Sequence, residues 1–215
     1  MTTVYFIRHA QAEGNLTGTV QGNIETGITP LGYEQIEALR QRFAGLQVDA
    51  VYSSDLRRAV ETAQAISRPR GLPIHTDRAF REVDFGNWEG HRWSELALTD
   101  PEQVGNFHQH LDRFHPPVGE TAQQLLARFL PALEGVIREN RDKTVVLVSH
   151  GLALRLVLGA LQGIAPADIA SLHGPNTAVS KAVWEGGVPR VIYQDDGGHV
   201  SHLGGGQVQG KEWWK

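Results

Sequence analysis

The sequence has no cysteine and only one methionine among its 215 residues. The absence of cysteine excludes disulfide bonds and thiolate metal sites within this chain. No apolar run is long enough to span a bilayer, and the longest, around "LALRLVLGAL", is interrupted by Arg155. Because no basic region precedes the first apolar run, we expect no signal peptide and predict a soluble, cytoplasmic protein.

An excess of positive charge is also missing, since the formal net charge is -4. The overall field therefore gives no reason to expect nucleic acid or a membrane as a partner, although a local cationic pocket is compatible with it. Hydrophobic residues make up 40% of the chain, which is enough for a substantial core.

Strand-like apolar runs alternate with helical patterns along the chain. The alternation predicts an α/β fold with a doubly wound, mostly parallel central sheet flanked by helices. Pro131 is expected to kink or split the helix in which it falls. The predicted strands cover residues 4–7, 49–54, 73–77 and 143–151, with a hairpin over 177–194, and the predicted helices cover 29–45, 55–71, 120–139 and 151–163.

A single domain is predicted over residues 1–200, and residues 201–215, which contain three consecutive glycines, are predicted to form a flexible tail. The pattern becomes irregular over about residues 87–118, which we interpret as a small helical cap. Its aromatic residues either roof a pocket or pack the cap against the sheet. These aromatic residues are Trp88, Trp93, Phe107 and Phe114.

Two predicted strands each end on a histidine. Arg8 and His9 follow the first strand, and His150 follows the strand of the "VVLVS" run. Ligands of doubly wound sheets bind beyond the carboxyl ends of strands, so both histidines should reach the same edge. A helix beginning near Asp55 should bring Arg58 to that edge, although a solvated helix face is the alternative for Arg58. The pattern indicates a pocket for an anion.

Four motifs carry a resemblance to a known family. "RHAQAEGN", "SSDLRRAVETA", "REVDFGNWEG" and "VSHG", in this order, resemble the histidine phosphatase superfamily, which has the phosphoglycerate mutase-like fold. The resemblance covers the chain from about residue 3 to residue 195. It implies a metal-independent phosphomonoester hydrolase that forms a phosphohistidine intermediate, uses no cofactor and acts on a small phosphorylated metabolite.

The resemblance also implies a role for each motif residue. His9 matches the nucleophile, with its second ring nitrogen held by a backbone carbonyl. His150 is expected to be at least partly protonated and to stabilise the transferring oxygens. Glu82 matches the acid/base carboxylate, with Asp84 as a local competitor, and a bound phosphate should favour the protonated form of Glu82. The expected phosphate-binding residues are Arg8, Asn15, Gln21, Gly22, Arg58, His150 and Gly151.

Two other functions compete with hydrolysis. The family's glycolytic mutases carry a longer insertion with paired arginines after the acid/base glutamate, whereas only 67 residues separate Glu82 from His150 here and no such pair occurs. A non-catalytic phosphate-binding module is less favoured because every catalytic residue type is present. Ala10, where the family usually has glycine, is a departure that bears on specificity.

The remaining motifs are weaker. His108 and His110 form a histidine-x-histidine pair without a nearby carboxylate or third histidine, so we predict no metal site. Asn176 reads as a turn residue that opens a strand. The sequence names no physiological substrate, and it leaves the oligomeric state open, a homodimer included.

Overall fold

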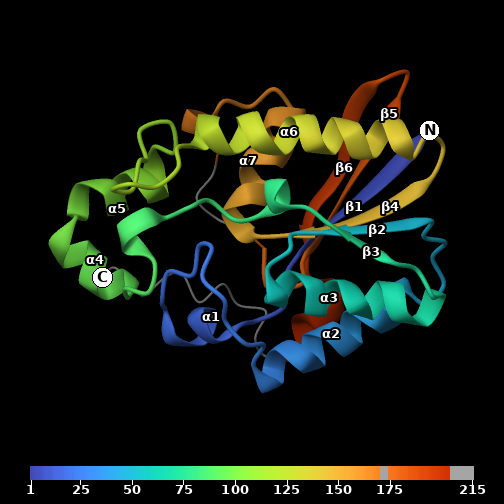
Figure 1. Cartoon of the computed structure of the whole chain (residues 1–215), viewed down its shortest axis with the longest axis horizontal. Coiled ribbons are helices and arrows are strands. Elements are labelled where there is room, and N and C mark those ends of the chain that lie inside the picture. Colours follow the sequence, from blue (N-terminus) through green and yellow to red (C-terminus); the bar gives the residue numbers. More distant parts are fainter. Residues whose placement is uncertain (170–173, 204–215) are drawn as a thin grey trace.

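The computed structural model describes residues 1–169 and 174–203 and contains a six-stranded sheet in the order β3-β2-β4-β1-β5-β6 (Figure 1). Strands β1 to β4 pair in parallel, and β5 and β6 join antiparallel to β1 as a hairpin. The predicted mostly parallel sheet is therefore confirmed. The strands are β1 (Thr2–Arg8), β2 (Ala50–Ser53), β3 (Ile74–Thr76), β4 (Thr144–Ser149), β5 (Val179–Glu185) and β6 (Val188–Asp196).

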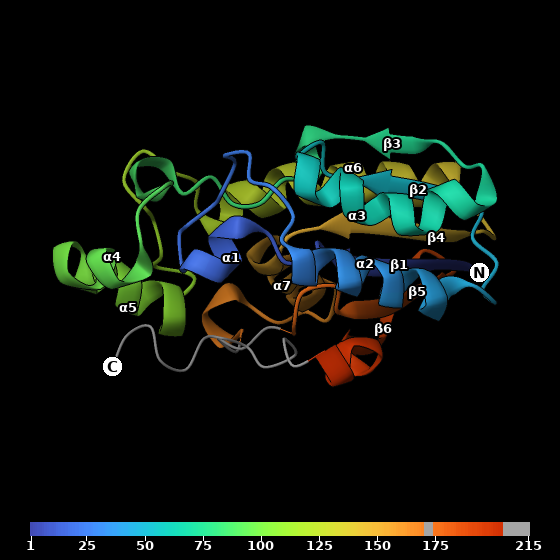
Figure 2. The same ribbon diagram turned by 90° about the horizontal axis from the view of Figure 1, so that it is seen from below.

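Helices cover both faces of the sheet, as the prediction of a doubly wound fold requires. Helices α2 and α3 lie on one face, and α6 and α7 lie on the other (Figures 1 and 2). The helices are α1 (Glu13–Thr17), α2 (Pro30–Phe43), α3 (Arg57–Ser67), α4 (Trp93–Thr99), α5 (Pro101–Gln109), α6 (Ala122–Glu139) and α7 (Gly151–Leu161).

Strand β1 shows how the sequence builds two cores. Successive strand residues point to opposite faces, so Val4 and Phe6 join the core under α6 and α7. Tyr5 and Ile7 join the core under α2 and α3. Burial on both faces explains why this strand is continuously apolar rather than alternating. It also fixes β1 rigidly up to the point where Arg8 and His9 begin the site.

Helix α6 runs as one element through Pro131, so the predicted split of this helix is wrong. Pro131 deprives the carbonyl of Ala127 of a partner, but both residues are exposed, and water can take the place of the missing N–H. The hydroxyl of Thr121 caps the helix by accepting from the amide of Gln124 at 3.2 Å.

Helices α4 and α5 lie beyond the carboxyl ends of the parallel strands, at the end of the molecule away from the N-terminus (Figures 1 and 2). The aromatic residues of these helices and of the segments beside them pack mainly on one another: the ring centroids of Trp93 and Phe107 are 4.5 Å apart, and those of Trp88 and Phe114 are 5.5 Å apart. Because Trp88 and Phe114 are both buried, the packing interpretation of these aromatics is favoured.

The predicted tail falls largely outside the described residues. Residues 201–203 belong to the short 3-10 helix Gly198–Leu203, and residues 204–215 are not described. Across the described ranges, 1–169 and 174–203, we find no helix with the length and apolar character that crossing a membrane requires.

Candidate active site

The two predicted histidines come together at one edge of the sheet. Strands β1 and β4 are adjacent and parallel, with Arg8 paired to Ser149, so His9 and His150 leave the two strands side by side. Their ring centroids are 5.1 Å apart and the rings are inclined at 56°. Both side chains are buried. The side chains of His9 and His150, far apart in the sequence, therefore lie side by side in the fold.

His9 is held in one tautomer. Its Nδ1 lies 2.7 Å from the carbonyl oxygen of Ala10, and only a protonated nitrogen can donate to that acceptor. Burial, Arg58 and Arg8 together place the pKa of His9 well below its usual value. A neutral ring with its proton on Nδ1 leaves the lone pair on Nε2, which is the state that the expected role of His9 as a nucleophile needs.

His150 differs from the expectation of a partly protonated ring. Burial first, and then the charge of Arg58, holds the pKa of His150 well below its usual value. Its two ring nitrogens are buried and have no hydrogen-bond partner among the described residues. The protein alone therefore favours neutral His150, and protonation requires an anion beside it.

Arg8 and Arg58 approach the histidines from different elements. Arg8 ends β1 and donates to the carbonyl of Gly174 at 2.7 Å. Arg58, in the first turn of α3, donates to the carbonyls of Ile24 and Gly22 at 2.8 and 2.6 Å. The pKa of each arginine is lowered to about 10, chiefly by burial. Since Arg58 is almost fully buried, the alternative of a solvated helix face is wrong.

The carboxylate of Glu82 lies against the first turn of α7, the helix that directly follows His150. Its oxygens accept from the backbone amides of Leu152 at 3.1 Å and Ala153 at 2.8 Å. The amide of Val83 also donates to it at 3.0 Å. Asp84, the competitor, is exposed and accepts from a neighbouring loop amide instead. Glu82 is therefore the carboxylate that the fold brings to the histidines.

The loop after β1 supplies other predicted residues, but several of them are engaged with the protein. The side-chain oxygen of Asn15 accepts from the amide of Ala12 at 3.0 Å. The side-chain oxygen of Gln21 accepts from the hydroxyl of Thr26. Gly22 presents its carbonyl to Arg58, as described above. Gly151 is the first residue of α7, whose positive N-terminal end faces this region.

Asn176 contributes more than the turn that the sequence indicates. Its amide nitrogen donates to the carbonyl of His9 at 2.9 Å and reaches the side-chain oxygen of Asn15 at 3.4 Å. It therefore ties the chain before β5 to the end of β1. A single asparagine in "GPNTAVS" carries no sequence signal for this contact.

Arg155 is a third buried arginine near the site. It lies in α7, is 4% exposed, and its pKa is lowered to about 10 by burial. The charges of Glu82 and Asp195 partly offset that effect, which places Arg155 within electrostatic reach of the site's carboxylate. The sequence signal for this residue is an arginine inside an otherwise apolar helix.

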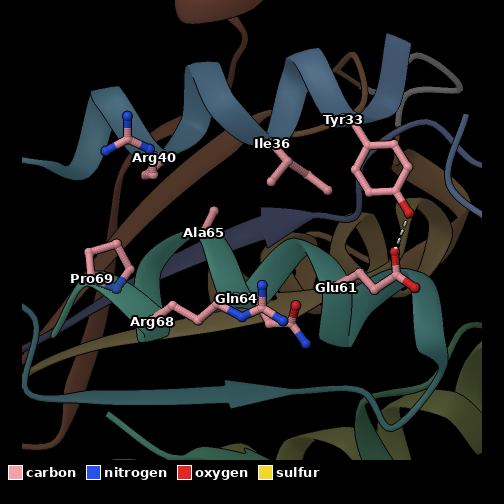
Figure 3. A pocket seen from close by; sticks show the side chains of 8 residues that line it. All are labelled: Tyr33, Ile36, Arg40, Glu61, Gln64, Ala65, Arg68 and Pro69. Atoms are coloured by element: carbon pink, nitrogen blue, oxygen red, sulfur yellow. Dashed lines mark hydrogen bonds between the residues drawn. The ribbon is translucent and has the colours of Figure 1, made fainter. Parts of the chain in front are cut away.

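No group of three or more metal-ligating side chains occurs in the parts of the chain that the structure describes. A hollow of about 500 Å³ lies elsewhere, between α2 and α3 (Figure 3). The hydroxyl of Tyr33 donates to Glu61 across it at 2.9 Å. None of the predicted site residues is among the residues that line this hollow, which are Tyr33, Ile36, Arg40, Glu61, Gln64, Ala65, Arg68 and Pro69.

The fold and this cluster of histidines and arginines are those of an α/β phosphatase. The chain belongs to the histidine phosphatase superfamily (branch 1), whose family model matches residues 4–196. A putative phosphoserine phosphatase 2 from Hydrogenobacter thermophilus is 31% identical over 94% of this chain and 100% of its own length.

Two further relatives differ in their named activities. A 2,3-bisphosphoglycerate-dependent phosphoglycerate mutase from Brucella melitensis is 34% identical over 78% of this chain and 84% of its own length. A phosphoserine phosphatase from Entamoeba histolytica, solved in complex with phosphoserine, superposes with a TM-score of 0.83 at 28% identity, over 93% of this chain and 100% of that one. The predicted family and fold are thus confirmed.

Proposed function

We propose that the protein hydrolyses phosphate monoesters of small metabolites through a phosphohistidine at His9. The observation that carries the proposal is a set of buried polar atoms without hydrogen-bond partners among the described residues: Nε of Arg8, Nε of Arg58 and both ring nitrogens of His150. Buried polar groups are nearly always paired, so such a set indicates a ligand rich in acceptor oxygens. A phosphoryl group has that chemistry.

In the first half-reaction, the Nε2 lone pair of His9 attacks phosphorus and the bond from phosphorus to the ester oxygen breaks. The leaving oxygen takes a proton from the carboxylic acid form of Glu82, so that an alcohol departs and Glu82 becomes a carboxylate. Arg8 and Arg58 hold the phosphoryl oxygens throughout. His150, once it is protonated beside the dianion, neutralises part of the developing charge.

In the second half-reaction, water attacks phosphorus on phospho-His9. The Glu82 carboxylate accepts a proton from that water, the bond from phosphorus to Nε2 breaks, and inorganic phosphate leaves. Glu82 is again a carboxylic acid and His9 is again neutral. Glu82 gives one proton in the first half-reaction and takes one back in the second, so a single carboxylate is sufficient for the whole cycle.

Phosphoglycerate mutase activity is the second candidate, and the 34% identity to a mutase supports it. A mutase returns the phosphoryl group to a bound substrate instead of to water. Here the segment between Glu82 and His150 is short and holds a cap of two short helices, α4 and α5. Isomerisation of phosphoglycerate that depends on a bisphosphate primer would establish the mutase over the hydrolase.

Within the hydrolase class we propose substrates that carry a carboxylate. The relatives named above are phosphoserine phosphatases and a phosphoglycerate mutase, whose named ligands share that group. Arg155 adds a third buried guanidinium to the cations near Glu82. Phosphoserine and phosphoethanolamine, which lacks only the carboxylate, form a matched pair, and we expect the higher kcat/KM for phosphoserine. Equal values would contradict this substrate class.

The test of the function is hydrolysis of p-nitrophenyl phosphate with a chelator present. We expect activity that the chelator does not reduce and a loss of at least about 1,000-fold in His9→Ala. Rapid quench with labelled substrate should trap a phosphoenzyme that survives alkali and decays in acid. Equal rates for wild type and His9→Ala would overturn the nucleophile, and phosphate binding without turnover would favour the binding module. A cytoplasmic location stays a prediction.

A further inference from the structure

Arg128 lies in the second turn of α6, outside every motif that identifies the family. Its guanidinium donates five hydrogen bonds to described residues. Two of them form a bidentate pair with the carboxylate of Glu120, at 2.7 and 2.8 Å. The other three reach the backbone carbonyls of Ala79, Arg81 and Glu82, at 2.7, 3.1 and 2.8 Å.

Two of the three carbonyls that Arg128 holds, those of Arg81 and Glu82, lie in a segment without regular structure. Residues 81–85 follow a 3-10 turn and belong to neither a helix nor a strand. Their carbonyls therefore lack the partners that a helix or sheet ladder would supply. Arg128 provides those partners with one rigid, planar group, so the carbonyl of Glu82 is fixed relative to α6.

Other contacts fix the opposite sides of the same segment. The side chain of Arg81 forms a bidentate ion pair with Asp55, just after β2, at 2.6 and 2.7 Å. The hydroxyl of Ser149, at the end of β4, donates to the carbonyl of Phe80 at 2.7 Å. Among the contacts to this segment, the hydrogen bond from Arg128 is the one made to the backbone of Glu82.

The position of the Glu82 backbone matters because it determines whether the carboxylate can reach its hydrogen-bond partners. It accepts from the amides of Leu152 and Ala153 at the start of α7, directly beside His150. A shift of about 1 Å in the backbone of Glu82 would break these hydrogen bonds and misplace a proton donor. Arg128 forms no described hydrogen bond to either histidine ring, but its charge is one of the causes that lower the pKa of His150. Arg128→Lys keeps that charge, so an effect of this variant on the chemistry passes through Glu82.

We propose that Arg128 is a positioning residue that holds Glu82 in place to protonate the leaving group. The proposal rests on the proposed function, in which Glu82 is the acid. Lysine cannot replace Arg128, because one ammonium group cannot reach three carbonyls and a carboxylate in this planar arrangement. The Glu120–Arg128 pair thus extends the active site to the start of α6.

The leaving group provides the test. An alkyl alcohol is a poor leaving group and needs a proton from Glu82, whereas p-nitrophenolate leaves without one. We expect Arg128→Met and Arg128→Lys to lower kcat/KM for phosphoserine by about 10- to 100-fold and for p-nitrophenyl phosphate by no more than about threefold. Glu82→Gln should show the same selectivity. Arg138→Lys, on the exposed face of α6, is the matched control and should leave both substrates unaffected.

The outcomes separate the two hypotheses. Suppose that Glu82→Gln lowers kcat/KM selectively for the alkyl ester. If both Arg128 variants then lower kcat/KM equally for the two substrates, or for neither, the positioning role is overturned and the proposed function stands. If Glu82→Gln itself lowers kcat/KM equally for both substrates, the assignment of Glu82 as the acid fails, and the proposal for Arg128 fails with it. Arg128→Lys keeps the charge, so it decides the question if Arg128→Met does not fold.

Discussion

The imidazole rings of His9 and His150 lie 5.1 Å apart at the ends of adjacent parallel strands. Two buried arginines, Arg8 and Arg58, lower the pKa of both histidines, on top of the larger effect of burial. Two neutral rings among cations form a pocket whose protonation is coupled to the charge of its ligand.

Binding of a dianion should therefore take up a proton. An anion beside His150 favours the imidazolium, so the pKa of His150 rises from well below its usual value. We expect sulfate, which does not titrate near neutral pH, to bind at pH 6.5 with uptake of up to about one proton. Calorimetry in buffers of different ionisation enthalpy measures the uptake, and His150→Gln should reduce it. Binding without uptake would contradict the coupling.

Gly22 should accommodate a side chain only with strain. Its φ is +47°, and a Cβ there would lie 1.9 Å from Oε1 of Glu89. Since the carbonyl of Gly22 also holds Arg58, we expect Gly22→Ala to lower kcat/KM by about tenfold or more. Gly71 is the matched control, because its φ is +64° and no atom lies within 4 Å of a Cβ there. Gly71→Ala should lower stability by about 1 kcal/mol and leave kcat/KM unchanged. Equal effects on kcat/KM in the two variants would contradict the argument.

The elements that the sequence predicts best are those whose signal is local. The continuous apolar runs of β1 and β4 and the histidines after them follow from strand periodicity. Parallel pairing then places the two histidines together without further information. Arg58 follows from a helix start, although its burial depends on the loop carbonyls of Gly22 and Ile24, which no local pattern indicates.

The sequence predicts a small helical cap over about residues 87–118, but not how the cap packs or which contacts support the site. Helices α4 and α5 are short, and what orders them is an aromatic cluster assembled from residues far apart, including Phe85 and Phe114. Arg128 and Asn176 act on backbone carbonyls of distant segments. Any residue can supply a carbonyl, so the partner leaves no trace in the sequence.

Asn176 should matter for both stability and activity. Removing its amide takes one of two donors from the buried carbonyl of His9, which keeps the longer hydrogen bond from the amide of Thr177 at 3.3 Å, so the cost is about 0.5 to 1.5 kcal/mol. We expect Asn176→Ala to lower the free energy of unfolding by this amount and to reduce kcat, because His9 loses an anchor. Urea denaturation and p-nitrophenyl phosphate kinetics provide the measurements. Asn87→Ala, at an exposed position in the cap, is the control. Unchanged kcat in Asn176→Ala would argue against the anchor.

The low pKa of His199 predicts how the stability of the protein responds to acid. Burial first, and then the charge of Arg42, lower the pKa of His199 to about 4. Nδ1 of His199 lies 3.1 Å from a guanidinium nitrogen of Arg42, so the neutral ring accepts that hydrogen bond. In the unfolded chain the histidine binds its proton near pH 6.5, whereas the folded protein resists protonation. The unfolded state therefore binds more protons between these values, and stability must fall as the pH drops from about 6.5 toward 4.

Mutations can show whether His199 causes this decrease in stability. The free energy of unfolding in urea should decrease between pH 7 and pH 5, and His199→Asn should make the decrease smaller, because asparagine binds no proton in either state. Arg42→Met should also reduce it, since removing the neighbouring charge raises the pKa of His199 toward its unfolded value. Part of the decrease should survive in both variants, because burial also lowers the pKa of His9 and His150. A full-sized decrease in His199→Asn would show that the C-terminal 3-10 helix does not contribute to acid sensitivity.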